Sequence, residues 1–186
     1  MAAMASESSH NDESAGYPVH PRLAVGGIVV EDDSILLVLR RNPPAAGEWT
    51  IPGGRVHTGE TLQAAVQREL KEETGLTVEV RDLAYHFELI DHDAEGAIRF
   101  HYVILDYLAI PLGGNLIPGD DVLDARWFAI ADLKQAARKQ LAFDRTLSKS
   151  SNPDRLKTPE APRFAHNAIV NTETLRAVAK LWPESD

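Results

Sequence analysis

The amino-acid sequence predicts an α/β fold with a mixed β-sheet, and three observations lead to it. Short segments rich in aliphatic and β-branched residues alternate with segments whose apolar residues recur at helical spacing. Turn-forming residues separate these segments. The length of 186 residues suits one domain of about 100–150 residues with additional tail. Strands that alternate with helices in this way pack in layers around a sheet.

The predicted strands are short and end at turn-forming residues. Glu31 to Ser34 is a turn signal between two almost continuously apolar segments, which predicts a hairpin buried on both faces. Pro52-Gly53-Gly54 ends a third strand. The strands are expected at residues 23–30, 35–40, 49–51, 76–86, 100–108 and 125–128, with a loop at 111–121.

Three segments have helical character. In the first, apolar residues recur at helical spacing between Thr58, an expected N-cap, and Gly75, which suits the position just after a helix. The other two helices are expected at residues 130–141 and 172–182, the last one capped by Asn171 or Thr172.

Composition divides the chain into three parts. Residues 1–16 are small, polar and acidic without an apolar period, so a disordered leader is expected there. Residues 17–141 contain the alternating pattern and form the expected domain. Residues 142–186 begin with a polar stretch and form a C-terminal extension with a terminal helix. This extension has three open roles: packing on the domain, forming a homodimer, or lining a ligand cleft.

Charge and cysteine content exclude several classes of function. The formal net charge of −9 argues against a nucleic-acid polymer or an anionic membrane surface as the main partner. The chain has no cysteine, which excludes disulfides, thiolate nucleophiles and cysteine-based zinc sites. The apolar runs are too short to span a bilayer, and the N-terminus lacks a secretory signal. A cytoplasmic location is therefore expected.

The first predicted helix carries an unusual cluster of acids. Glu69, Glu72 and Glu73 lie at positions i, i+3 and i+4, so their side chains share one helix face. Like charges at this spacing destabilise a helix, and negative charge near its C-terminal end adds to the cost. Carboxylate oxygens are also hard ligands that suit Mg²⁺ or Mn²⁺. The cluster is either a solvated helix face or a site for divalent cations that bind phosphate and water.

Neighbouring residues favour the metal site. Arg68 is placed to pair with Glu72 one turn along the helix, or with Glu60, and so to orient a ligand. The glycine pair Gly53-Gly54 lets the backbone turn sharply and approach a metal, with a carbonyl as a further ligand.

The segment from Gly54 to Leu76 matches the pattern Gly-x5-Glu-x7-Arg-Glu-U-x-Glu-Glu-x-Gly-U at every position, where U is aliphatic. At average residue abundance, a chance match occurs in roughly one of 10⁹ windows. The pattern is the signature of the Nudix hydrolases, and the chain resembles that family. The order of elements over residues 22–141 agrees with this family, so residues 17–141 are the expected Nudix hydrolase domain.

The resemblance implies a fold, a reaction and a ligand set. Nudix enzymes have an α/β/α sandwich with a mixed sheet, and they use Mg²⁺ or Mn²⁺ to hydrolyse a nucleoside diphosphate linked to another moiety. By the family pattern, Glu69, Glu72 and Glu73 are the metal ligands, and the carbonyl of Gly53 assists them. Glu60 and Arg68 are the supporting pair that positions these ligands.

Some members of the family take a further carboxylate from a loop late in the fold, as a metal ligand or general base. The loop before Trp127 contains Asp121, the first choice for this role, and Asp120, the second. The alternative is that these acids only begin a turn.

Candidate substrate contacts follow from position and residue type. Arg55 directly follows the glycine pair, and Arg41, with Arg40, ends a strand nearby, so these arginines are candidate phosphate or ribose contacts. The alternative is that they are ordinary surface arginines. Tyr102 or Phe87 is a candidate for stacking on a base, with packing in the core as the alternative.

Several stretches outside the box resemble the ADP-ribose pyrophosphatase group, in which ADP-ribose is cleaved to AMP and ribose 5-phosphate. They are Trp49-Thr-Ile-Pro-Gly-Gly, His101-Tyr-Val-Ile-Leu-Asp-Tyr-Leu and Gly119-Asp-Asp before Arg126-Trp-Phe. The alternatives are a nucleoside triphosphate pyrophosphatase for modified nucleotides and a non-catalytic nucleotide sensor on the same fold. Sensors commonly lose box carboxylates, whereas this chain retains every one.

Overall fold

The structure is a computed structural model that describes residues 17–148 and 169–183, with side chains described for 17–142 and 169–183. The leader expected at residues 1–16 lies outside the described residues, as does most of the polar stretch after Ala142. The elements in chain order are β1 Arg22–Glu31, β2 Ser34–Arg40, β3 Trp49–Thr50, β4 Gly53–Arg55, α1 Leu62–Thr74, β5 Thr77–His92, β6 Ile98–Gly113, β7 Val122–Ala129, α2 Ile130–Ser148 and α3 Thr172–Leu181.

The strands within residues 17–148 form one mixed seven-stranded sheet. Its main order is β3-β2-β1-β6-β5, while β4 pairs with β1 and β7 pairs with β2. β1 pairs in parallel with β6 and antiparallel with β2 and β4. β1 is therefore the central strand, and it connects β4, which leads into α1, with the long β5–β6 hairpin.

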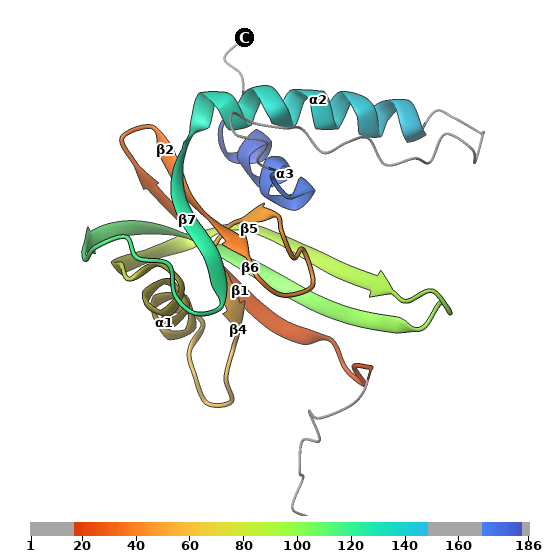
Figure 1. Cartoon of the computed structure of the whole chain (residues 1–186), viewed down its shortest axis with the longest axis horizontal. Helices are drawn as coiled ribbons and strands as arrows, with labels where there is room; N and C mark the ends of the chain where they lie inside the picture. Colours follow the sequence, from red (N-terminus) through yellow and green to blue (C-terminus); the bar gives the residue numbers. More distant parts are fainter. Residues whose placement is uncertain (1–16, 149–168, 184–186) are drawn as a thin grey trace, which may run out of the picture.

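Helices cover both faces of this sheet (Figure 1). Helix α1 buries Ala65, Val66 and Leu70 against one face, in a core shared with β1, β2, β5 and β6. Helices α2 and α3 bury Leu133 and Leu175 against the other face. The structure confirms the predicted α/β/α sandwich.

Strand β2 explains why its sequence is continuously apolar. Successive side chains of a strand point to opposite faces of the sheet. Ile35 and Leu37 accordingly pack in the core under α2 and α3, whereas Leu36 packs in the core under α1. Both faces of the strand are buried, which confirms the prediction for this hairpin.

The ends of α1 confirm one sequence expectation and correct another. Gly75 takes the left-handed conformation, with φ 74°, that ends the helix, as predicted. The N-cap is Thr61 rather than the expected Thr58, because the Thr61 side chain accepts a hydrogen bond from the N–H of Ala64. Thr58 lies in the preceding turn, which brings the N–H of His57 to the carboxylate of Glu60.

The sheet is larger than the sequence predicts. β5 and β6 run as a hairpin over 77–92 and 98–113, where strands were expected only over 76–86 and 100–108. The far part of this hairpin is largely solvent-exposed, so it lacks the apolar run that marks a buried strand. β4 was not predicted, because Gly53-Gly54 has a low strand propensity and pairs only through its tertiary neighbour β1.

The C-terminal helix packs on the domain. Val170 pairs with Trp49 of β3 through backbone hydrogen bonds: Trp49 N–H donates to Ile169 O at 2.8 Å, and Asn171 N–H donates to Trp49 O at 2.9 Å. Asn171 then caps α3 by accepting a hydrogen bond from the N–H of Glu173 at 2.9 Å. Of the roles left open for the extension, packing on the domain is thus observed.

Candidate active site

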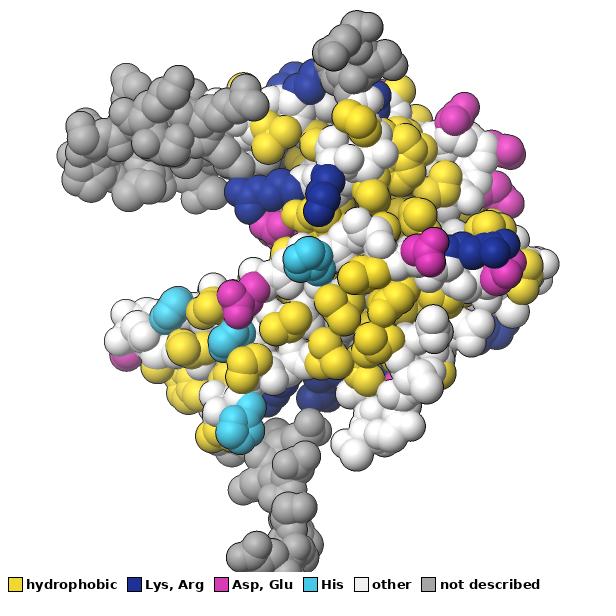
Figure 2. Space-filling view, turned by 180° about the vertical axis from the view of Figure 1, so that it is seen from behind, with side chains coloured by type: hydrophobic (Ala, Val, Ile, Leu, Met, Phe, Trp, Pro, Cys, Tyr) yellow, Lys and Arg dark blue, Asp and Glu magenta, His cyan; other side chains and the backbone are white. Residues whose placement is uncertain are grey.

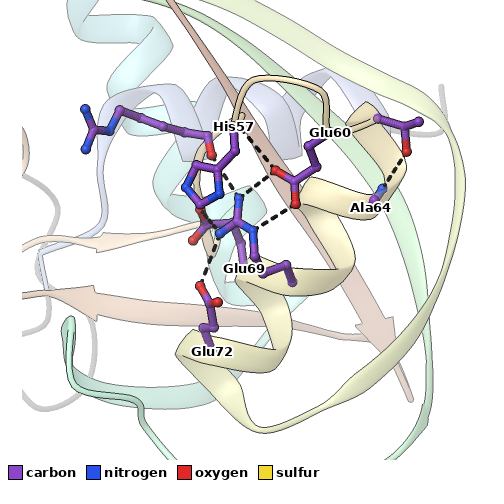
Figure 3. A network of polar contacts seen from close by, with 8 residues as sticks. His57, Glu60, Ala64, Glu69 and Glu72 are labelled. Carbon is purple, nitrogen blue, oxygen red and sulfur yellow. Dashed lines mark hydrogen bonds and ion pairs between the residues drawn. The ribbon is translucent and has the colours of Figure 1, made fainter. Parts of the chain in front are cut away.

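Arg68 joins the loop before α1 to the acidic face of that helix (Figure 3). Its guanidinium donates two hydrogen bonds to Glu60, from Nε to Oε1 and from Nη2 to Oε2, each 2.9 Å long. Nη1 donates to Glu69 Oε1 at 2.7 Å and to Glu72 Oε2 at 3.1 Å. Hydrogen bonds from Arg68 lower the pKa of Glu60 to about 2. Both pairings that the sequence offered for Arg68 are therefore present, and Glu60 stays ionised.

Glu73 is the buried member of the acidic cluster. Its Oε2 accepts a hydrogen bond of 2.9 Å from the N–H of Gly53. Burial raises the pKa of Glu73 to about 7, against the opposing effects of the Gly53 N–H and the charge of Arg40. Glu69 and Asp121 raise the pKa further through like-charge repulsion. No described residue forms an ion pair with this carboxylate.

The glycine pair allows β4 to approach the helix closely. A β-carbon at position 54 would lie 2.4 Å from Oε1 of Glu69, so any other residue would displace that carboxylate. Gly53 reaches the cluster through its N–H group, and the role of its carbonyl as a metal ligand stays a prediction. The pair therefore positions two of the three glutamates against the backbone of β4.

The loop between β6 and β7 caps the C-terminal end of α1. The N–H of Ile117 donates to Thr74 O, and the N–H of Gly119 donates to Glu73 O, each at 3.0 Å. These contacts satisfy carbonyls that a helix end leaves unpaired. They also bring the exposed Asp120 and Asp121 to the acidic cluster, so that Asp121 acts on the pKa of Glu73.

Arg41 holds the same loop from the other side. Its Nε donates to Asp120 O at 2.9 Å, and its Nη2 donates to Val122 O at 3.3 Å. These contacts brace the backbone around Asp121, and substrate binding by Arg41 stays a prediction. Arg40 lies close enough to Glu73 to lower its pKa.

The other predicted substrate contacts lie on three strands of the sheet, β4, β5 and β6. Arg55 is exposed at the end of β4, and its carbonyl accepts a hydrogen bond of 3.0 Å from Arg68 Nη2. Tyr102 is half-buried on β6 and stacks on Phe100, with ring centroids 6.3 Å apart. Phe87 packs against Tyr85 on β5 at 5.9 Å. Among the described residues, no contact joins these rings to the acidic cluster.

Asp106 was not predicted as a functional residue, and it is 3% exposed in the middle of β6. Its signal was available, because it is the single acidic residue of the apolar segment 102–110. A charged residue is rarely buried in such a strand without a partner.

Within the described side chains, no three His, Asp or Glu residues converge tightly enough to hold a metal ion as they stand. The donor set nevertheless fits a hard divalent cation. It consists of carboxylate oxygens, and the buried Glu73 lacks an ion-pair partner among the described residues. A cation at Glu69, Glu72 and Glu73 has to replace or share the contacts that Arg68 now makes with Glu69 and Glu72.

A model of the NUDIX domain matches residues 20–149, which include the acidic helix, the glycine pair and the capping loop. The chain belongs to the Nudix family. An ADP-ribose pyrophosphatase of Methanocaldococcus jannaschii is 40% identical over 126 residues, which are 68% of this chain and 69% of that protein. An 8-oxo-dGDP phosphatase of Mus musculus is 32% identical over 142 residues, covering 70% of this chain and 41% of that protein.

Among solved structures, a MutT NUDIX hydrolase from Burkholderia pseudomallei has a TM-score of 0.59 and 28% identity, covering 88% of this chain and 99% of that one. These findings confirm the resemblance read from the sequence, and the chain is a Nudix hydrolase. Nudix hydrolases act on small nucleotide substrates and generally use divalent metal ions. Helix α3 lies outside the matched residues. No helix in the described part of this chain is both long and apolar enough to cross a membrane.

Proposed function

We propose that this Nudix hydrolase cleaves the diphosphate bond of ADP-ribose and releases AMP and ribose 5-phosphate. The observation that carries a diphosphatase function is the cluster of Glu69, Glu72 and Glu73, in which the buried Glu73 forms no ion pair with any described residue. The 40% identity to an ADP-ribose pyrophosphatase supports the choice of substrate.

Mg²⁺ or Mn²⁺ is the proposed cofactor. Glu69, Glu72 and Glu73 would hold it, with the carbonyl of Gly53 as an additional ligand. When bound, such ions neutralise charge on the diphosphate and lower the pKa of a bound water. Glu60 keeps Arg68 in position through two hydrogen bonds, so Arg68 orients Glu69 and Glu72.

Asp121 is the proposed general base. Its carboxylate is exposed to water beside the acidic cluster, and the braces from Arg41 hold the backbone on both sides of it. In this role, a carboxylate oxygen of Asp121 accepts a proton from the water that attacks phosphorus. The attacking oxygen stays on one product phosphate, and the bridging oxygen leaves with the other.

The assignment is tested by comparing ADP-ribose with 8-oxo-dGTP as substrates of the full chain, in Mg²⁺ and in Mn²⁺, with the products identified. ADP-ribose should turn over faster and yield AMP. An untouched ADP-ribose together with rapid hydrolysis of 8-oxo-dGTP would contradict the assignment.

A second candidate is hydrolysis of modified purine nucleotides. It is supported by the 32% identity to an 8-oxo-dGDP phosphatase over 70% of this chain. The same assay distinguishes the two candidates, because the second one predicts a nucleoside monophosphate and inorganic pyrophosphate from 8-oxo-dGTP. A non-catalytic sensor would hydrolyse neither compound but would still bind one of them.

A further inference from the structure

Asp106 lies in one row of the sheet with the glycine that contacts the catalytic helix. In the register of the strands, Gly26 of β1 pairs with Gly53 of β4 on one side and with Asp106 of β6 on the other. Adjacent strands are about 4.7–4.9 Å apart, so Asp106 lies about 10 Å from Gly53 along this row. Gly53 in turn donates its N–H to Glu73.

The Asp106 carboxyl group leans along this row toward β4. A β-carbon on Gly26 would lie 2.2 Å from Oδ1 of Asp106 and 3.1 Å from Cγ2 of Ile51. Ile51 packs against the core under α2 and α3, so the carboxyl lies on that face of the sheet, opposite α1. Because position 26 is glycine, the Asp106 carboxyl group can occupy the space above β1, between β6 and Gly53 of β4.

Among the side chains that the structure describes, this carboxyl group has no partner. It is 3% exposed, and no described residue donates a hydrogen bond to it or forms an ion pair with it. The polar side chains nearby bind Glu173 of α3 instead. The Tyr85 hydroxyl donates a hydrogen bond of 3.2 Å to Glu173, and Arg176 forms an ion pair with Glu173. Burial, with repulsion from Glu173, raises the pKa of Asp106 to about 7.

An isolated buried acceptor is costly, and buried polar groups are ordinarily hydrogen-bonded. The carboxyl oxygens of Asp106 are not sealed from solvent, so a hydrogen-bond donor can reach them from outside the fold. A ligand can supply the missing donor. Figure 2 shows a notch between the β5–β6 hairpin and the layer of α2 and α3, and Asp106 lies on the sheet face that borders it.

We propose that Asp106 accepts a hydrogen bond from an uncharged donor on the nucleoside part of the substrate, and that this contact determines which nucleoside diphosphates are accepted. The donor is a sugar hydroxyl or a base amino group. This inference rests on the proposed function, since it places the diphosphate at the glutamates of α1. The aromatic Tyr102 lies four residues from Asp106 on the same face of β6, where a base has an apolar surface.

The first experiment removes donors from the ligand. The full-length protein is assayed with ADP-ribose, with its inosine analogue, which lacks the base amino group, and with 2′-deoxy and 3′-deoxy analogues. The analogue that lacks the bonded donor should raise KM by about 10- to 100-fold with little change in kcat, because it leaves a buried acceptor without a partner. If every analogue has the same KM as ADP-ribose, the inference is wrong. This outcome uses only the wild-type protein, so it does not depend on whether any variant folds.

The second experiment removes the acceptor. Asp106→Ala should raise KM for ADP-ribose by the same factor as removal of the bonded donor from the ligand. The variant should then have equal KM values for ADP-ribose and for the analogue that lacks this donor. Asp106→Asn, which keeps the size, should keep an acceptor oxygen and show an intermediate loss. Both variants should unfold at a temperature equal to or above that of the wild-type protein at pH 8, because they remove an unpaired buried carboxylate.

A matched control is Asp82→Asn, which removes an exposed carboxylate of β5 and should leave KM unchanged. Unchanged KM in Asp106→Ala would overturn the inference. A fall in its unfolding temperature, with equal losses on every analogue, would show a structural role only. The proposed function fails separately, if the wild-type protein does not hydrolyse ADP-ribose. In that case, the analogues that lack one hydrogen-bond donor are made from the nucleotide that the wild-type protein does hydrolyse.

Discussion

The backbone N–H of Gly53 donates a hydrogen bond of 2.9 Å to the carboxylate of Glu73, which connects β4 to the last turn of α1. This contact fixes a buried acid of the helix against the glycine pair that precedes it in the sequence. Gly54, the first residue of the family signature, lies directly against the carboxylate of Glu69, so the signature includes part of the loop as well as the helix. The loop positions the backbone, and the helix supplies the side chains.

Replacing either of two glutamates should abolish most of the activity. Glu72→Gln and Glu73→Gln retain side-chain size but lose the negative charge that binds a divalent cation. Changes to partners of metal ligands cost about 10- to 100-fold, so loss of a ligand should lower kcat by at least about 100-fold. The measurements are kcat and nucleotide binding by calorimetry, with the exposed Glu79→Gln as control. Unchanged turnover in both variants would refute the metal assignment.

Arg68→Lys should lower turnover although it keeps the positive charge. A lysine cannot reproduce the paired hydrogen bonds to Glu60 and the contacts with Glu69 and Glu72 at the same time. The expected loss is about 10- to 100-fold in kcat or in metal affinity. Titration of activity with Mg²⁺ separates these effects. Activity equal to that of the wild-type protein would mean that Arg68 does not position the glutamates.

The metal-free protein should lose stability as the pH rises from about 4.5 to above 7. The fold raises the pKa of Glu73 from 4.5 to about 7, so its stabilising contribution is complete below pH 4.5 and is lost as the pH passes 7. The difference corresponds to about 3 kcal/mol. Asp106 acts in the same direction.

Thermal unfolding in the presence of a chelator, from pH 4.5 to 8, measures this effect. The Glu73→Gln variant should show a weaker decline and should exceed the wild-type protein in stability at pH 8. Mg²⁺ should stabilise the wild-type protein at pH 8 more than it stabilises this variant. Parallel profiles for the two proteins would contradict the assigned pKa of Glu73.

Arg41→Ala should reduce kcat through Asp121. The substitution removes two hydrogen bonds that hold the backbone at Asp120 and Val122. If Asp121 is the general base, Asp121→Asn should lower kcat by about 10²–10⁴-fold, and adding Arg41→Ala should then have little further effect. Full additivity in the double variant would show that Arg41 acts on the substrate instead.

Leu175→Ala should destabilise the whole domain. Leu175 is fully buried in the core that α3 shares with α2 and β2. Removal of a buried leucine side chain costs about 2–5 kcal/mol. Denaturant unfolding measures the change, and Ile169→Ala, at a residue that is 37% exposed, is the matched control. Equal, small effects in both variants would show that α3 is not part of the cooperative unit.

Local patterns predicted those elements whose stability depends on residues close in the sequence. The apolar run of β2 predicts burial on both faces of the sheet, and Gly75 predicts the end of α1. The N-cap was misassigned because Thr58 and Thr61 are equivalent as local signals. Only the position of the turn, in which Glu60 binds Arg68, decides between them.

The fold class and the acidic face of α1 could be predicted from local patterns, and the acidic face follows because helix geometry places residues three and four apart on one side. The tertiary structure decided which groups meet that face. Arg41 braces the loop of Asp121, Gly53 binds Glu73, and Asp106 lies over Gly26 through strand order and register. These contacts join residues that are 20 to 81 positions apart. Spacing along the chain does not encode such contacts, because they form only when separate strands and helices have packed together.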